Sequence, residues 1–187
     1  MLDHNTALKT IDVFYVLDMD RCLVNTEKLQ ALLQRVIKRE LGIQSDEMNL
    51  ARREYERAGG SFDTAGYVMG VLDGRGMDGP SVWHDVTRIF VQEAQAQDML
   101  EPYAAELLRR LRMEEVQYGI VTYGSDTWQL TKLEAAGLTA IPHLVTHDVA
   151  KARLIASWQH AEGFLVPTIL AGERLLARRL VFIDDKP

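Results

Sequence analysis

Short apolar runs alternate with longer amphipathic segments along much of this chain. The run VFYVL at residues 13–17 ends in the polar sequence DMD, and similar runs occupy residues 116–122, 143–146 and 180–183. Continuous apolar runs of this length are typical of strands buried on both faces of a parallel sheet. Helical patterns are expected between them, at residues 102–113, 126–136, about 150–161 and around 172–178. This alternation predicts βαβ units that build one parallel sheet.

The segment from residue 26 to residue 97 has a different pattern, with no convincing strand. Leucine, valine and isoleucine recur at helical spacing from Thr26 to Gly42, and Ser45 caps a second, strongly charged helix. Residues 61–72 and 80–97 predict two further helices. The predicted fold class is therefore α/β, with a Rossmann-like parallel sheet core at residues 1–25 and 98–187. An all-helical cap insertion is predicted at residues 26–97.

Composition and charge narrow the range of functions. The 187 residues include 21 Lys and Arg against 27 Asp and Glu, which gives a net charge of −6. Electrostatic binding to nucleic acid or to an anionic membrane is therefore not expected. The sequence predicts neither of them as a partner. The single cysteine, Cys22, has no partner for an intramolecular disulfide, and the first residues lack the pattern of a secretion signal. We therefore expect a cytoplasmic protein, whose oligomeric state the sequence leaves open.

Polar residues stand at the end of each predicted strand, which is where open α/β sheets bind their ligands. Right-handed crossovers place the carboxyl ends of parallel strands along one edge, so we expect these side chains to converge on one crevice. In chain order they are Asp18, Asp20, Thr122, Tyr123, Lys151, Asp184 and Asp185. Four carboxylates at close range repel one another unless a cation neutralises them. Their oxygen ligands and high charge favour Mg²⁺ as the cofactor.

These residue types suit phosphoryl transfer. With Mg²⁺ bound, the carboxylate of Asp18 is able to attack phosphorus, and Asp20 is placed to act first as general acid and then as base. Thr122 and nearby backbone N–H groups are able to bind the phosphoryl oxygens, while Lys151 balances their charge. Cys22 has no histidine tied to it by a recognisable local pattern. We therefore interpret Cys22 as a packing residue rather than as a nucleophile.

Four sequence motifs, in order, carry a resemblance to a known family. VFYVLDMDRCLVNT resembles the first motif of the haloacid dehalogenase (HAD) superfamily, and GIVTYGSDTWQLTKLEAAGL is similar to the second. Lys151 resembles the lysine of the third motif, and LVFIDD resembles the paired acids of the fourth. The helical insertion between the first two motifs is similar to one of the family's cap types.

This resemblance implies a role for each site residue. Asp18 would be the nucleophile that forms an aspartyl-phosphate, and Asp20 would be the acid and base. Thr122, Tyr123 and Lys151 would bind the phosphate. The implied ligands of Mg²⁺ are Asp18, the backbone carbonyl of Asp20, Asp184 and Asp185.

Three departures from the family pattern stand out. Arg21 occupies a position where many members have glycine, which removes backbone freedom there. Ala152 follows Lys151 where the family often has proline, so Arg153 is an alternative cation for the site. The sequence also stops two residues after Asp185, where the family continues, and we expect the sheet edge beside the fourth motif to be unpaired.

The expected function is a Mg²⁺-dependent phosphatase that acts on a small phosphorylated substrate. Asp20 favours phosphatase or phosphomutase over dehalogenase within the resemblance, because phosphotransfer members use an acid and base two residues after the nucleophile. Two alternatives remain open at this point: a phosphomutase, and a catalytically idle binding module that has kept the fold.

Overall fold

The computed structural model describes residues 8–58, 62–148 and 150–185 of the chain. By their contacts, the residues divide into two compact units. The core unit contains the residues up to 24, residues 100–123 and those from 139 onward. The helical unit contains residues 25–99 and 124–138.

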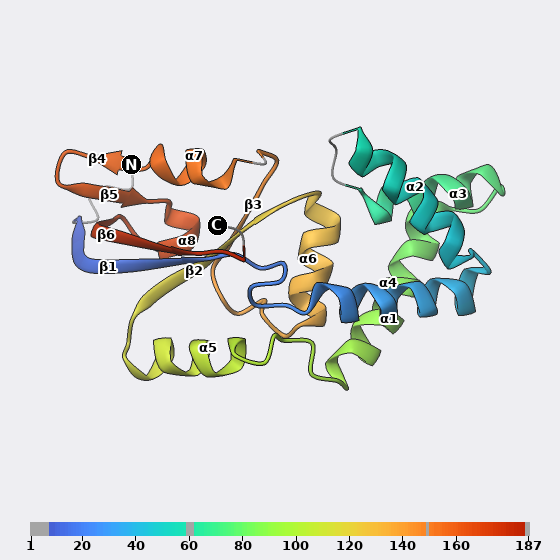
Figure 1. The fold of residues 1–187 in the computed structure, drawn as a ribbon, viewed down its shortest axis with the longest axis horizontal. Helices are drawn as coiled ribbons and strands as arrows, with labels where there is room; N and C mark the ends of the chain where they lie inside the picture. The colour runs from blue at the N-terminus through green and yellow to red at the C-terminus, as the bar shows by residue number, and fades with distance from the viewer. Residues whose placement is uncertain (1–7, 59–61, 149, 186–187) are drawn as a thin grey trace, which may run out of the picture. The chain divides into compact units, whose positions relative to one another are not determined.

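A six-stranded sheet lies at the centre of the core unit (Figure 1). Four strands run parallel in the order β3-β2-β1-β6, and the antiparallel strands β5 and β4 extend the sheet beyond β6. The strands are β1 (Lys9–Leu17), β2 (Gln117–Tyr123), β3 (His143–Thr146), β4 (Gln159–His160), β5 (Gly163–Val166) and β6 (Leu175–Ile183). The predicted α/β class with a Rossmann-like parallel sheet is confirmed.

Helices cover both faces of this sheet. On one face, α7 (Lys151–Ala156) and α8 (Thr168–Ala171) contribute Ile155 and Leu170 to an apolar cluster with Phe14 and Val16 of β1. On the other face lies α5 (Ala104–Met113), which buries Leu108 and Leu111 (Figure 1). Burial on both sides explains why the apolar runs of β1 and β2 are continuous rather than alternating.

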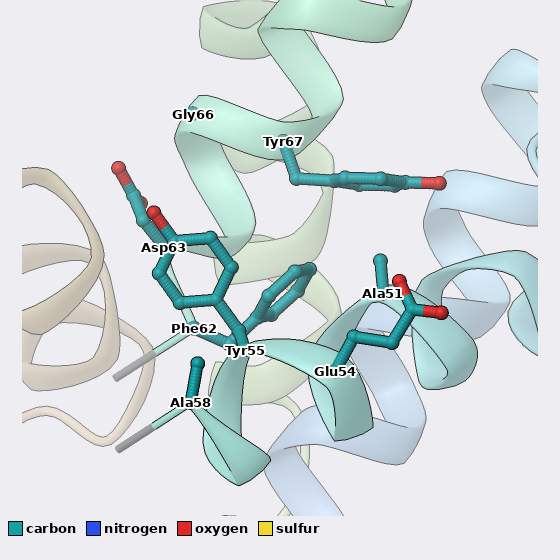
Figure 2. A pocket seen from close by; sticks show the side chains of 8 residues that line it. All are labelled: Ala51, Glu54, Tyr55, Ala58, Phe62, Asp63, Gly66 and Tyr67. Atoms are coloured by element: carbon teal, nitrogen blue, oxygen red, sulfur yellow. The ribbon is translucent and has the colours of Figure 1, made fainter. Parts of the chain in front are cut away.

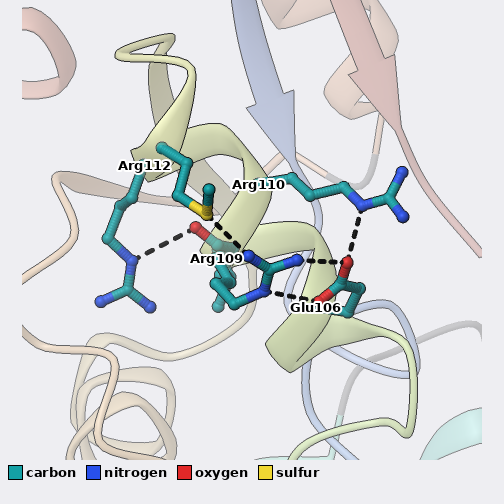
Figure 3. A network of polar contacts seen from close by, with 6 residues as sticks. Glu106, Arg109, Arg110 and Arg112 are labelled. Carbon is teal, nitrogen blue, oxygen red and sulfur yellow. Dashed lines mark hydrogen bonds and ion pairs between the residues drawn. The ribbon is translucent and has the colours of Figure 1, made fainter.

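The solvent side of α5 carries a network of ion pairs (Figure 3). The carboxylate of Glu106 accepts hydrogen bonds of 2.7 Å from both Arg109 and Arg110. These hydrogen bonds lower the pKa of Glu106 to about 2. All three side chains are exposed, so water and salt screen the network. Its contribution is to the local stability of α5 rather than to the packing of the core.

The parallel register of the central strands places the carboxyl ends of β1 and β6 side by side, with β2 on the other side of β1. Leu17 of β1 pairs with Ile120 of β2 on one side and with Ile183 of β6 on the other. Immediately after this point, the backbone N–H of Asp18 donates a 2.8 Å hydrogen bond to the carbonyl of Ile183. The residues that follow β1 and β6 are therefore neighbours, although they lie at opposite ends of the sequence.

The segment after β3 corrects two predicted elements. The helix predicted around residues 172–178 is wrong, because β6 begins at Leu175. Gly172, with φ of 73°, ends the short helix α8, and the run LLARRL then pairs with β1. Leucine, alanine and arginine favour helix in isolation, but pairing in a buried sheet overrides this preference. The helix predicted at 150–161 is also too long, because α7 ends at Ala156 and the hairpin of β4 and β5 follows.

The outer edge of β6 is only half paired. β5 pairs with Leu175, Leu176 and Ala177 at the start of β6. Among the described residues, no strand pairs with the outer edge of residues 178–183. The unpaired edge expected beside the fourth motif is therefore found in the second half of β6 alone.

The described residues of the helical unit form five helices. They are α1 (Thr26–Leu41), α2 (Ser45–Arg57), α3 (Thr64–Gly74), α4 (Gly79–Gln95) and α6 (Asp126–Ala135). The side chain of Asn25 caps the start of α1 by accepting from the N–H of Lys28, and Gly42 ends the helix in a left-handed conformation. Phe90 of α4 packs on Trp128 of α6, with 6.1 Å between the ring centroids. The predicted boundaries of a core and a cap domain stay a prediction.

None of the helices in the described ranges is long and apolar enough to cross a membrane.

Candidate functional site

An ion-pair cluster lies at the carboxyl ends of β1 and β6. The Nζ atom of Lys151 is 2.6 Å from Oδ2 of Asp18 and 3.0 Å from Oδ2 of Asp184. Oδ1 of Asp18 accepts a 2.7 Å hydrogen bond from the backbone N–H of Met19. Asp18 is only 4% exposed, so its carboxylate is largely shielded from solvent. The arrangement combines a buried carboxylate with a cation, as expected from the strand ends.

Three carboxylates of this cluster have the chemistry of a divalent cation site. Asp18, Asp184 and Asp185 each offer an oxygen atom, and these atoms lie within 4.8 Å of one another. Carboxylate oxygens are the ligands that Mg²⁺ prefers, and three of them carry enough negative charge to hold it. The side chain of Asp20 lies outside this group of three, and the predicted role of its backbone carbonyl stays a prediction. The residues present therefore fit Mg²⁺.

The cluster shifts the pKa of Asp18 upward. Burial of the carboxyl raises its pKa to about 6, and the nearby charge of Asp184 acts in the same direction, while Lys151 opposes both. Burial disfavours the charged form of Lys151 as well, but its hydrogen bonds and charge interactions with Asp18 and Asp184 outweigh burial and raise its pKa. Lys151 is therefore an ammonium group at neutral pH and stays paired with the acids.

The end of β2 contributes a buried hydroxyl. Thr122 is 0% exposed, and its Oγ1 atom has no hydrogen-bond partner within the described residues. An unpaired buried hydroxyl costs stability, and native structures keep few of them. Such an atom is suited to bind an oxygen of a ligand. Tyr123, the last residue of β2, is half-buried and pairs with Thr146 of β3.

The turn after β1 contains Asp20 and, next to it, a residue with an unfavourable backbone conformation. Asp20 is half-buried and forms an isolated bridge with Val24. Arg21 has a φ of 61°, in the left-handed region that favours glycine. Its N–H donates to the carbonyl of Val24 at 3.0 Å, and its own carbonyl accepts a 3.2 Å hydrogen bond from the hydroxyl of Tyr103. The departure noted at Arg21 thus falls on a position that does need glycine's conformation.

Cys22 lies beside the site but is not suited to act as a nucleophile. It is buried, and its Sγ atom donates to the carbonyl of Ile183 at 3.6 Å. Burial and the negative charges of Asp18, Asp184 and Asp185 raise the pKa of the thiol to about 11. The thiol therefore stays neutral, which agrees with its interpretation as a packing residue.

Three features of the site are seen only in the structure and could not be decided from the sequence. Arg153 is exposed, so Lys151 and not Arg153 is the cation at the site. The ring of Phe182 lies below Lys151, with 5.6 Å between Nζ and the ring centroid. The hydroxyl of Tyr103 supports the turn at Arg21. Phe182 sits inside an apolar strand and Tyr103 near a helix start, and neither position carries a sequence signal for such a contact.

Comparison with solved structures supports the fold. A protein from Burkholderia xenovorans LB400, described as a haloacid dehalogenase-like hydrolase, matches 94% of this chain and 74% of its own with a TM-score of 0.58. The two sequences are 18% identical over this match. The chain has the HAD fold. The resemblance inferred from the four motifs is confirmed at the level of the fold.

Two further solved structures match with lower TM-scores. YfnB from Bacillus subtilis, described as a HAD-hydrolase and bound to magnesium, is 17% identical with a TM-score of 0.46, over 81% of this chain and 75% of its own. CbbY from Rhodobacter sphaeroides, in complex with xylulose-(1,5)bisphosphate, is 15% identical with a TM-score of 0.37, over 66% of this chain and 54% of its own. No protein-family model matches the sequence, and no curated protein matches it.

Proposed function

We propose that this HAD-fold chain is a Mg²⁺-dependent phosphohydrolase that cleaves a small phosphate monoester through an aspartyl-phosphate on Asp18. The observation that carries the proposal is the cluster in which Lys151 contacts Asp18 at 2.6 Å beside the acids Asp184 and Asp185. A buried nucleophile, a cation and a set of hard oxygen ligands meet there, which is the set of groups that phosphoryl transfer requires.

The proposed reaction has two steps. In the first, an oxygen of Asp18 forms a bond to phosphorus while the bond to the leaving alcohol breaks, and Asp20 donates a proton to that alcohol. In the second, Asp20 removes a proton from a water molecule that attacks the same phosphorus. The bond between phosphorus and Asp18 then breaks, which releases inorganic phosphate and restores both carboxyl groups.

The remaining residues bind and orient the phosphoryl group. We infer that the buried hydroxyl of Thr122, which has no partner among the described residues, donates to one phosphoryl oxygen and that the adjacent Tyr123 binds another. When substrate binds, the ammonium group of Lys151 interacts with the phosphoryl oxygens as well as with Asp18. Asp18, Asp184, Asp185 and the carbonyl of Asp20 would hold Mg²⁺, which when bound would supply the positive charge that lets an anionic nucleophile approach an anionic phosphate.

The predicted cap at residues 26–97 belongs to the same proposal. A cap that closes over the site excludes water and bulky partners, so a small phosphorylated substrate is favoured over a protein or a nucleic acid. We place the activity in the cytoplasm, in keeping with a single buried cysteine that has no disulfide partner within the chain.

A screen of phosphate monoesters tests this function. The full chain is assayed for release of inorganic phosphate with Mg²⁺ and with a chelator, beside Asp18→Asn and the control Glu162→Gln, which removes an exposed acid of the core unit. We expect turnover that needs Mg²⁺, a loss of about 1,000-fold or more in Asp18→Asn, and no change in the control. Turnover that does not depend on Mg²⁺, or that is unchanged in Asp18→Asn, would contradict the proposal.

The same screen separates the two alternatives. A phosphomutase would transfer the phosphoryl group to a second hydroxyl of the substrate, and phosphorus NMR would show a rearranged ester in place of inorganic phosphate. An idle module would bind Mg²⁺, visible as a shift in melting temperature, without turning over any ester.

A further inference from the structure

The helical unit contains a pocket of about 660 Å³ that the proposed chemistry does not use. Its wall is formed by one side of α2 and by the start of α3 with the residues just before it (Figure 2). The residues that line it are Ala51, Glu54, Tyr55, Ala58, Phe62, Asp63, Gly66 and Tyr67. Pockets that bind small molecules have volumes in this range.

Three of the residues that line the pocket are aromatic. The ring centroids of Tyr55 and Phe62 are 6.3 Å apart with planes at 72°, and those of Phe62 and Tyr67 are 5.5 Å apart with planes at 48°. Three rings in direct succession, each tilted against the next, present ring faces and edges from several directions. Tyr55 is 58% exposed, so a large part of its side chain is open to a ligand.

The charges in the wall have one sign. Glu54 and Asp63 are acidic, and none of the eight lining residues is basic. In Figure 2 the carboxylate of Glu54 lies on the side of the pocket below the ring of Tyr67. Oδ1 of Asp63 accepts a 3.0 Å hydrogen bond from Ser125, which holds this second carboxylate at the pocket wall. Glu54 is therefore the acid that is best placed to balance a charge inside the pocket.

One contact within the chain already uses this chemistry. The guanidinium of Arg52, next to the pocket, lies over the ring of Phe62 at 5.4 Å from its centroid. A cation at this distance is attracted by the negative face of the ring. The rings of Tyr55 and Tyr67 offer the same kind of surface to a cation that enters from solvent.

We propose that this pocket binds a small organic cation with an alkylated ammonium group. Aromatic rings arranged around a space, with a carboxylate at the side, form the type of site that recognises quaternary ammonium groups. An apolar pocket that had neither aromatic ring faces nor an acid would not favour a charged ligand over a neutral one of the same shape. Charge, rather than shape, is therefore what this site selects.

A pair of ligands with the same shape tests the selectivity. Choline and 3,3-dimethylbutan-1-ol differ in that the quaternary nitrogen of choline is replaced by carbon, which removes the charge. Each is titrated into the full chain at constant ionic strength, while the aromatic proton signals of Tyr55, Phe62 and Tyr67 are followed by NMR. We expect choline to bind more tightly by about three- to thirtyfold. Equal affinities, or signals that do not move, would overturn the proposal.

Two substitutions and a matched control localise the binding. Glu54→Gln and Tyr67→Leu should each weaken choline binding by about three- to tenfold, because each removes one attraction for the cation. Glu47→Gln removes an exposed acid from the same helix α2, outside the pocket, and should leave binding unchanged. A loss in Glu47→Gln equal to that in Glu54→Gln would show a general charge effect and contradict the site.

The inference rests on residues to which the proposed phosphatase reaction assigns no role. All residues that line the pocket belong to the helical unit, whereas the acids and Lys151 of the candidate site belong to the core unit. Choline should therefore bind to Asp18→Asn as tightly as to the unsubstituted chain. Binding without any phosphatase turnover would support the pocket and contradict the proposed function, and turnover without binding would do the reverse.

Discussion

The ammonium of Lys151, at the start of α7, lies 2.6 Å from the carboxylate of Asp18 at the end of β1. This contact joins the third motif to the first across most of the sequence. It exists because β1 and β6 run parallel and end side by side, where Lys151 contacts both Asp18 and Asp184. The ion pair makes the edge of the sheet a charged site that is buried enough for its charges to interact strongly.

Replacement of Lys151 tests its place in the reaction. Lys151→Gln removes the charge that faces the phosphoryl oxygens, and we expect phosphatase turnover to fall by about 100-fold. Arg153→Gln is the matched control, because it removes an exposed cation from the same helix and should leave turnover unchanged. Steady-state kinetics on both variants checks this. Equal losses in the two variants would show that the site needs positive charge nearby but not Lys151.

The raised pKa of Asp18 predicts how stability depends on pH in the absence of metal. Its pKa is about 6 in the folded chain and 3.8 for an aspartate carboxyl in water, so the folded state holds the proton more tightly. This contribution to stability is complete below the unfolded pKa and is lost as the pH rises through the folded pKa. The shift corresponds to about 3 kcal/mol, lost between about pH 4 and pH 6.

Chemical denaturation at several pH values, with a chelator present, measures this effect. Many carboxyl groups titrate in the same range, so the informative quantity is the difference between the unsubstituted chain and Asp18→Asn. The unsubstituted chain should lose stability relative to Asp18→Asn as the pH rises from 4 to 6. Parallel stability curves for the two proteins would mean that Asp18 is not held in the environment described above.

We expect replacement of Thr122 to increase the stability of the chain and to lower its activity. Thr122→Val removes a buried hydroxyl that has no partner among the described residues, so the free energy of unfolding should rise by about 1 kcal/mol. Turnover should fall by about tenfold or more, because a phosphoryl oxygen loses its donor. Thr146→Val is the comparison on the neighbouring strand: its hydroxyl accepts from the N–H of Asp148 at 3.1 Å. Loss of that bond should destabilise the chain, so the two substitutions are expected to have opposite signs.

We expect the backbone conformation of Arg21, in the turn after β1, to lower the free energy of unfolding. Its φ of 61° is unfavourable for any residue with a side chain, so Arg21→Gly should raise the free energy of unfolding by about 0.5–1 kcal/mol. Glu115 has a φ of 52° after α5, and Glu115→Gly should give a similar gain away from the site. Urea denaturation compares the three proteins. A loss of stability in Arg21→Gly alone would mean that the arginine side chain contributes more than its backbone costs.

Much of the fold follows from local patterns in the sequence. The helix at Thr26–Leu41 has an apolar stripe, a capping asparagine and a terminal glycine, so both its type and its ends are predictable. The run VFYVL carries the mark of a strand covered on both faces, and DMD marks its end. The convergence of Asp18, Lys151 and Asp184 also follows, because parallel strands with right-handed crossovers share one carboxyl edge.

The missed features depend on contacts that no local pattern contains. The composition of LLARRL favours a helix, and only its pairing with β1 shows that it is a strand. The hairpin of β4 and β5 has strands of two and four residues, which are too short to show an alternation of apolar and polar residues. The hydrogen bond from Tyr103 to Arg21 joins a helix start to a turn far away in the sequence. The pocket between α2 and α3 depends on how the two helices pack, which the periodicity of each helix leaves undetermined.

A crystal structure of the full chain with Mg²⁺ and beryllium fluoride is the most direct test of the account. Beryllium fluoride binds to a carboxylate as a mimic of an acyl phosphate. We predict that it is bonded to an oxygen of Asp18, with Mg²⁺ held by Asp184 and Asp185 and with a fluorine atom within hydrogen-bond distance of Oγ1 of Thr122. Beryllium fluoride on any other residue, or Mg²⁺ away from these acids, would contradict the assignment of Asp18 as the nucleophile.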